Sequence, residues 1–270
     1  MMAQRPLNVV FAVCHPDDEV VWAGGLLCEF SRIPFLRTFV ICLSGNDAGS
    51  PRLAEFEAAK RVAGYTAGVI GGGALRGALE PLPPPGETLL EGLKTIALQP
   101  GDIDLLITHA PYGDEHRNPH HIQAHRELNA WCKARNIGFA HFACLALAGA
   151  SHRSLLKDLR RHGTLRLLQL ARCTGPAGTP RYYVQFMTDA AAKMRLTQCY
   201  PSIGLAEHDD AYTMFSNPCE ALYLQDDRAL APISALVKIM TAPGSSPLIL
   251  ERSLFTRIGA RLRRMMHRGS

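Results

Sequence analysis

The sequence lacks any apolar run close to the ~20 residues that a membrane-spanning helix needs. It also lacks the pattern of a signal peptide, because the first apolar run is short, has no small-residue cleavage site and leads directly into acidic residues. No GxGxxG motif follows that first run, so a dinucleotide-binding enzyme is not indicated. We therefore expect a cytoplasmic protein.

The eight cysteines form no CxxC pair. Several lie inside apolar runs, such as Cys42 and Cys144, where they are typical of small buried hydrophobic residues in a reducing compartment. The pattern predicts neither a disulfide framework nor a cysteine-based zinc finger.

The charge is concentrated at one end of the chain. The net charge of the chain is +5. Residues 251–270 contain six arginines and one glutamate, so this segment alone carries a charge of +5. The nearly neutral remainder argues against a nucleic-acid binder. With 47% apolar and 20% charged residues, we expect a globular domain over 1–250, with its core in 1–150 and 151–250 shaping the substrate pocket. Residues 251–270 form a predicted basic amphipathic tail.

Predicted strands alternate with predicted helices through the first 145 residues. The strands are 8–14, 37–43, 67–70 and 103–108, and the helices are 20–33, 51–64, 87–98 and 119–133. This alternation predicts right-handed βαβ units in a three-layer α/β/α sandwich with a mostly parallel, Rossmann-like sheet. Farther on we expect a solvated helix face in 151–170, a strand at 182–187 and a helix at 190–199.

A dense polar turn, His15-Pro16-Asp17-Asp18-Glu19, follows the first predicted strand. An imidazole and a carboxylate three residues apart are typical zinc ligands, so His15 and Asp18 are candidates. Asp17, between them, is placed to act as a general base. Helix capping alone explains three adjacent acids poorly, because they repel one another unless a cation is near.

Five histidines, at 109, 116, 120, 121 and 125, follow the fourth predicted strand at the same sheet edge. Asn118 is expected to cap a helix that begins at Pro119, which places His121 in the first turn facing that edge. We expect His109 to pack beside the site and His125 to pack or form a hydrogen bond within the helix.

The two motifs resemble those of the PIG-L/LmbE-like family of zinc-dependent N-acetyl-sugar deacetylases. The resemblance is carried by the turn at 15–19, by the glycine-containing loop at 44–49 with Arg52 and Glu55 after it, and by Pro119-His120-His121. A weaker element lies around 190–201 with Lys193.

The resemblance implies that His15, Asp18 and His121 bind Zn²⁺ or another divalent metal, with Asp17 as the general base. It also implies a mobile tyrosine near the oxyanion, Tyr112, and a substrate-binding arginine, Arg52. We further expect Asn46 and Asn118 to contact the substrate.

One position departs from the family pattern. The family usually has a histidine three residues before the last metal ligand, where this chain has Asn118. We expect His116 or His120 to take over that catalytic role, and we favour His116 because a loop residue can swing inward.

The resemblance implies a metal-dependent hydrolase that removes an N-acetyl group from an amino sugar in a glycoconjugate or sugar-containing metabolite. The sugar would be a small molecule or lipid-linked. One alternative is a non-catalytic sugar-binding member of the family. Another is a protein that acts at the inner face of a membrane through its tail, where the apolar residues Leu254, Phe255, Ile258, Leu262 and Met265 recur at near-helical spacing among arginines. For the tail, the favoured interpretation is a helix that packs its apolar side on the body and leaves its arginines in water, or a disordered end.

Overall fold

The computed structural model describes residues 5–74, 80–113, 117–142, 166–172, 182–204 and 219–241. His116, the predicted tail at 251–270 and residues 151–165 of the basic stretch predicted at 151–170 lie outside these residues. The larger elements are β1 (Leu7–Val13), α1 (Asp18–Phe30), β2 (Leu36–Cys42), α2 (Pro51–Ala63), β3 (Ala67–Ile70), α3 (Pro85–Thr95), β4 (Leu105–Thr108), α4 (Pro119–Arg135), β5 (Gly138–Phe142), β6 (Arg166–Arg172), β7 (Tyr182–Met187), α6 (Ala190–Thr197), β8 (Cys219–Leu224) and α8 (Asp227–Thr241).

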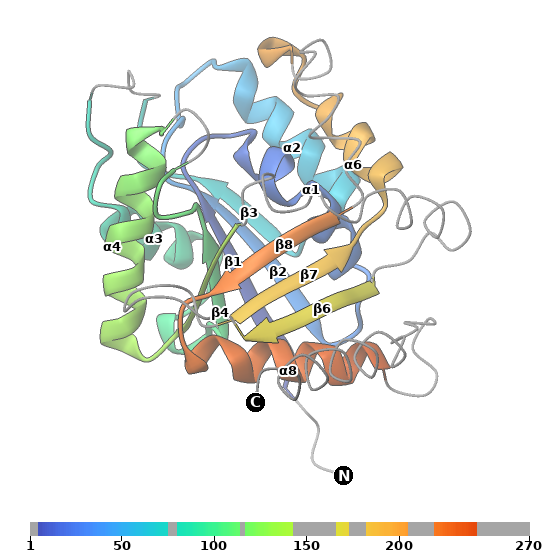
Figure 1. Cartoon of the computed structure of the whole chain (residues 1–270). Coiled ribbons are helices and arrows are strands. Elements are labelled where there is room, and N and C mark those ends of the chain that lie inside the picture. Colours follow the sequence, from blue (N-terminus) through green and yellow to red (C-terminus); the bar gives the residue numbers. More distant parts are fainter. Residues whose placement is uncertain are drawn as a thin grey trace, which may run out of the picture.

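A single eight-stranded sheet has the order β3-β2-β1-β4-β5-β8-β7-β6 (Figure 1). The first five strands pair in parallel, and β8, β7 and β6 continue the sheet with antiparallel pairs. The predicted α/β fold with a mostly parallel sheet is therefore confirmed. The order 3-2-1-4-5 reverses direction between β1 and β4, and ligands bind at such switch points in open α/β sheets.

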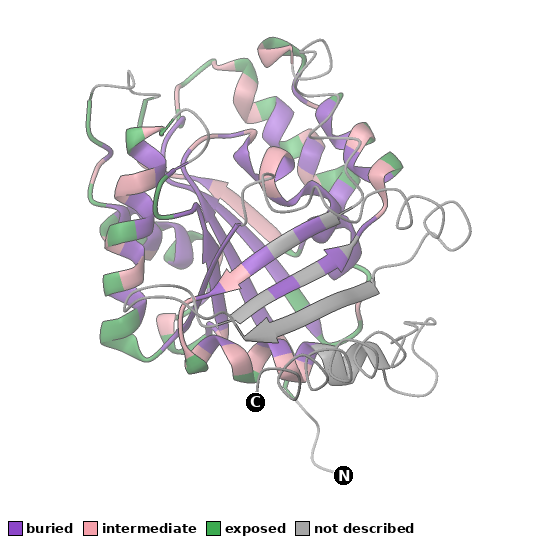
Figure 2. Cartoon of the chain, viewed as in Figure 1, coloured by how far each residue is buried: buried purple, intermediate pink, exposed green. Residues whose placement is uncertain are grey.

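Helices cover both faces of the parallel part of the sheet. Alternate residues of β1 divide between two apolar cores, with Val9, Phe11 and Val13 on the side of α1, α2 and α6. Val10 and Ala12 face α3 and α4. Figure 2 shows the central strands buried along their length. This two-sided burial explains why β1 reads as an almost continuous apolar run.

The structure corrects one expectation about the C-terminal half. The end of the stretch predicted as a helix face, residues 166–170, belongs to strand β6 (Arg166–Arg172), which pairs with β7. Its sequence, RLLQLAR, is too short to distinguish the apolar spacing of a helix from that of a strand. Pairing with a neighbouring strand therefore decides the outcome. The strand at 182–187 is confirmed, and the helix at 190–199 is confirmed as α6.

Two further expectations concern cysteines and membranes. The cysteines with described side chains are all free thiols, at 14, 28, 42, 132 and 199. Among the helices of the described ranges, none is long and apolar enough to cross a membrane.

Polar contacts join α1 to the antiparallel part of the sheet. The backbone N–H groups of Gly25 and Leu26 donate to the carboxylate of Glu220 on β8, at 3.0 and 2.6 Å. Lys193 of α6 also pairs with Glu220, at 2.7 Å between Nζ and Oε1. The C-terminal strands are therefore tied to the helix that follows the polar turn.

Gly25 allows this close approach, so replacing it with alanine is expected to destabilise the protein. An added Cβ would lie 2.3 Å from Oγ1 and 2.6 Å from Cβ of Thr188, which forces α1 away from the sheet. We expect a loss of about 1–3 kcal/mol in the free energy of unfolding, measured by urea titration. The control is Gly101→Ala, where nothing lies within 4 Å of the added atom. Equal losses in the two variants would contradict this account.

Candidate metal centre

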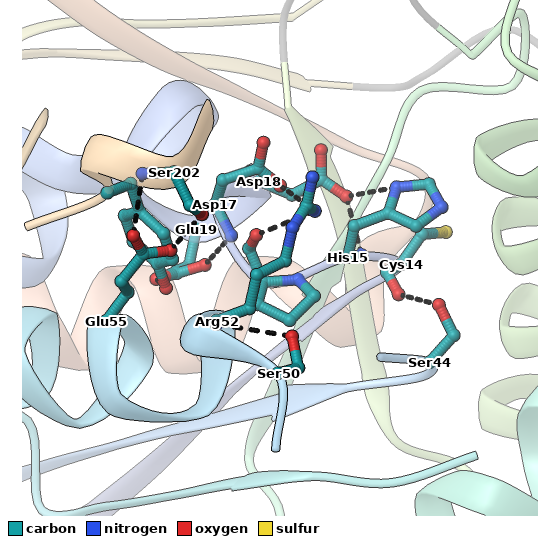
Figure 3. A network of polar contacts seen from close by, with 12 residues as sticks. Cys14, His15, Asp17, Asp18, Glu19, Ser44, Ser50, Arg52, Glu55 and Ser202 are labelled. Carbon is teal, nitrogen blue, oxygen red and sulfur yellow. Dashed lines mark hydrogen bonds and ion pairs between the residues drawn. The ribbon is translucent and has the colours of Figure 1, made fainter. Parts of the chain in front are cut away.

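Several predicted site residues, among them His15, Asp17, Asp18 and His121, lie at the carboxyl ends of β1 and β4, where the strand order reverses. His15, Asp17 and Asp18 follow β1 after Cys14, and Figure 3 shows them together with Cys14 and Arg52. His109 follows β4, and α4 begins at Pro119. Asn118 caps α4 as predicted, because its Oδ1 accepts a hydrogen bond from the His120 N–H at 3.0 Å.

A single carboxylate oxygen lies at the centre of this cluster. Asp18 Oδ2 is 3.2 Å from His15 Nδ1, 3.3 Å from His121 Nε2 and 3.4 Å from His109 Nε2. The backbone N–H of His15 also donates to this oxygen, at 2.8 Å. The three side chains predicted to bind the metal, His15, Asp18 and His121, are therefore in mutual contact.

Cys14 and His109 enlarge the set of donor groups. Donor atoms of Cys14, Asp18, His109 and His121 all lie within 4.8 Å of one another, and all four residues are buried. This cluster fits a metal site. From the sequence, Cys14 was expected only as the last residue of the buried strand 8–14, and His109 was expected to pack beside the site. The sequence feature that could have identified both as site residues is their position, because each is the first residue after its strand.

The hydrogen bonds of His120 indicate which ring nitrogen of His15 carries a proton. A carbonyl oxygen can only accept, so His120 Nε2 carries the proton that it shares with Glu80 O at 2.7 Å. Burial lowers the pKa of His120 and keeps it neutral, so its Nδ1 accepts from His15 Nε2 at 2.9 Å. In neutral His15, Nδ1 then points a lone pair at Asp18 Oδ2. A cation between these two electron-pair donors relieves their repulsion, so the residues fit a metal.

His109 is engaged differently. The Cys14 N–H donates to His109 Nε2 at 3.0 Å, so this nitrogen is the unprotonated one. Burial lowers the pKa of His109 to about 4, which keeps it neutral. Its ring stacks on His121 at 3.7 Å between centroids, with 8° between the planes. The bond from Cys14 competes with metal coordination by His109.

Asp17 lies beside the cluster in a strained conformation. Its φ of 130° and ψ of −32° are rare for a residue with a side chain, and such outliers cost about 1–3 kcal/mol and gather at functional sites. Burial, together with the charge of Asp18, raises the pKa of Asp17 well above its usual range. For Asp18, burial also opposes ionisation, but the contact with His121 holds its pKa well below the usual range. The pKa values of these two adjacent carboxyls are therefore shifted in opposite directions.

Arg52 contacts the polar turn from α2. Its Nη1 is 4.0 Å from Asp17 Oδ1 and 3.5 Å from Pro16 O. Ser50 caps α2 by accepting from the Arg52 N–H at 3.3 Å. Two other predicted residues are more exposed: Asn46 lies in the loop after β2, and Tyr112, at 44% exposure, lies in the turn after β4.

Two buried histidines lie outside the cluster. His125 hydrogen-bonds His109 O through Nδ1 at 2.8 Å, as expected for a helix residue that supports the loop. His141 on β5 uses Nδ1 to contact Phe142 O at 2.9 Å. Its Nε2 has no hydrogen-bond partner within the described residues. Burial lowers the pKa of His141 from 6.5 to about 3.

His141 is expected to make the protein less stable in acid. Between pH 6.5 and 3 the unfolded chain binds a proton at His141 that the folded protein excludes, so stability falls as the pH falls. We expect the wild type to lose about 1.4 kcal/mol per pH unit relative to His141→Phe below pH ~6, and nothing above pH ~7. Urea titrations of both proteins across this range provide the measurement. Parallel stability curves would contradict the prediction.

Comparison with known proteins shows the fold. No protein-family model and no curated protein sequence matches this chain. Similar solved structures include a deacetylase from the teicoplanin biosynthesis pathway in complex with bog, at 13% identity and a TM-score of 0.52, covering 82% of this chain and 99% of that chain. The zinc-inhibited form of teicoplanin deacetylase matches at 13% identity, a TM-score of 0.51 and the same coverage. The A40926 pseudoaglycone deacetylase matches at 13% identity and a TM-score of 0.51, covering 82% of this chain and 97% of that chain.

Proposed function

We propose that this protein is a metal-dependent N-deacetylase that hydrolyses the acetamide of an N-acetylated amino sugar. The observation that carries the proposal is the convergence of three imidazole nitrogens on Asp18 Oδ2, with the strained Asp17 beside them. The resemblance of the two sequence motifs and the shared fold with deacetylases support the same reaction class.

The proposed metal ligands are His15, Asp18 and His121. His15 is favoured because His120 orients its Nδ1 toward Asp18, as groups behind a metal ligand commonly do. His109 is less favoured because its lone pair already accepts the Cys14 N–H. When bound, a divalent metal supplies a Lewis acid that polarises a carbonyl oxygen. Two nitrogens and one oxygen suit Zn²⁺ but also other divalent ions.

Asp17 is the proposed general base. It takes a proton from the water that attacks the acetamide carbon, and it delivers that proton to the departing nitrogen as the C–N bond breaks. The products are acetate and a free amine. The pKa of Asp17 is raised toward the working pH, and a group with such a pKa can both accept a proton and return it. Arg52, beside Asp17, is the proposed contact for sugar oxygens, and Tyr112 and His116 are proposed to act from the loop after β4.

The roles proposed for Asn46, Asn118 and His120 follow the same pattern. Asn46 and Asn118 are proposed to contact the substrate, although the Asn118 side chain also caps α4. Both ring nitrogens of His120 are engaged, with His15 and with Glu80 O, so we favour His116 over His120 for proton transfer. One sheet runs from β1 to β8, which supports treating 1–250 as one domain.

Metal content and acetate release test the proposal on one preparation. The purified protein is stripped with a chelator, reloaded with Zn²⁺ and incubated with an N-acetylglucosamine conjugate. We expect one metal per chain and metal-dependent acetate release. Metal binding without acetate release from a panel of N-acetyl amino sugars would favour the non-catalytic sugar-binding alternative. Absence of metal binding would overturn the proposal.

A further inference from the structure

Glu19, the last acid of the polar turn, has two hydrogen-bond partners from distant parts of the chain. It is fully buried, with 0% exposure. Its Oε1 accepts a hydrogen bond from the Tyr200 hydroxyl, and its Oε2 accepts from the Asp17 N–H at 3.0 Å. The carboxylate therefore links a residue 181 positions away in sequence to the backbone of the proposed general base.

The Asp17 backbone needs such support because its φ of 130° is unfavourable for a residue with a side chain. Its carbonyl oxygen accepts from the N–H groups of Val20 and Val21, both at 2.9 Å, as α1 begins. Its own N–H is bound by Glu19. With both backbone polar groups bound, the direction of the Asp17 Cα–Cβ bond is set, and with it the origin of the side chain.

Tyr200 is itself held in place by neighbouring contacts. It is fully buried and directly precedes a short 3₁₀ helix, Pro201–Ile203. Glu55 accepts from the Ser202 N–H at 2.7 Å and from the Ser202 hydroxyl at 2.6 Å. Glu55 lies one turn after Arg52 on α2, and Figure 3 shows its carboxylate facing Ser202. The segment that carries Tyr200 thus docks beside both Asp17 and Arg52.

We propose that Tyr200 is a positioning residue, which acts through Glu19 to hold Asp17 in its catalytic orientation. The inference rests on the proposed function, because it assigns a distant residue to the general base of that reaction. The segment from α6 to residue 204 is then part of the catalytic apparatus and does more than complete the fold.

The test compares Tyr200→Phe with Tyr65→Phe. Tyr65 is also a buried tyrosine of the same apolar core, and its hydroxyl has no hydrogen-bond partner within the described residues. Both changes remove one oxygen atom. For Tyr200→Phe we expect kcat to fall about tenfold to 100-fold, because small displacements of a catalytic group have effects of this size. The KM and the metal content should stay unchanged, and Tyr65→Phe should keep full kcat.

A double-mutant cycle with Glu19→Gln separates positioning from general loss of stability. If Tyr200 acts through Glu19, Tyr200→Phe should lower kcat much less in the Glu19→Gln background than in the wild type. Independent, multiplicative effects would overturn the proposal. A wild-type kcat in Tyr200→Phe would also overturn it, as would a fall in kcat matched by Tyr65→Phe.

A crystal structure of Tyr200→Phe distinguishes this inference from the proposed function. We expect the Asp17 N–H to lose its bond to Glu19 and the Asp17 φ to change. If the wild type releases no acetate, the proposed function fails, yet this structural result still supports the link from Tyr200 to Asp17. An unchanged Asp17 backbone and Glu19 contact would overturn the inference even in an active deacetylase.

Discussion

Replacing Asp17 with asparagine is expected to lower kcat by about 10²- to 10⁴-fold while the protein keeps its metal. An amide of the same size cannot accept the proton of the attacking water, and general bases contribute effects of this order. Asparagine tolerates positive φ better than most residues, so the turn should keep its shape. Asp17 is not among the side chains whose nitrogen atoms surround Asp18 Oδ2, which are His15, His109 and His121. Steady-state acetate release and metal analysis of the same sample provide the measurement.

The matched control is Asp104→Asn. Asp104 lies just before β4, at the amino ends of the parallel strands and away from the site. There it pairs with Arg5 and accepts a hydrogen bond from the Asn8 N–H. This variant removes a carboxylate far from the cluster and should keep its kcat, although it can lose stability. If Asp17→Asn keeps full turnover, Asp17 is not the base. If it loses its metal, Asp17 belongs to the ligand set.

The sequence allowed the parallel half of the sheet and the position of the site to be predicted. Strand β1 and the turn at 15–19 are contiguous, so a local pattern contains both the buried strand and the polar groups at its end. His109 likewise follows β4 directly, and the helix that begins at Pro119 comes soon after it in the sequence. Because parallel strands expose their carboxyl ends at one edge, the two motifs were expected to meet there.

Contacts between distant segments could not be predicted in the same way. Tyr200 and Glu19 are 181 positions apart, and neither sequence neighbourhood signals the other. The hydrogen bond from the Cys14 N–H to His109 Nε2 depends on how β1 and β4 are aligned. Strand β6 was mistaken for part of a helix because its seven residues fit both periods, and its pairing with β7 is a tertiary effect.

Replacing Asp18 with alanine is expected to lower metal affinity more than 100-fold and to abolish acetate release. The loss of groups that merely orient ligands already costs about 10- to 100-fold in affinity, and Asp18 is the oxygen around which the imidazoles gather. Its pKa lies well below the usual range, so a carboxylate is available to bind a cation at neutral pH. Competition with a chromophoric chelator measures the affinity of each variant.

Three further variants, one of them a control, identify which donors complete the set. His125→Asn changes a buried histidine one turn after His121 on α4, at a residue bonded to the His109 carbonyl, and should keep the metal. Cys14→Ser tests the alternative set, because the Cys14 side chain lies within 4.8 Å of the other donor atoms. Retained affinity in Cys14→Ser and loss in His15→Ala would support His15, Asp18 and His121. The reverse result would place the metal deeper, between Cys14 and His109, where the imidazole must first release the Cys14 N–H.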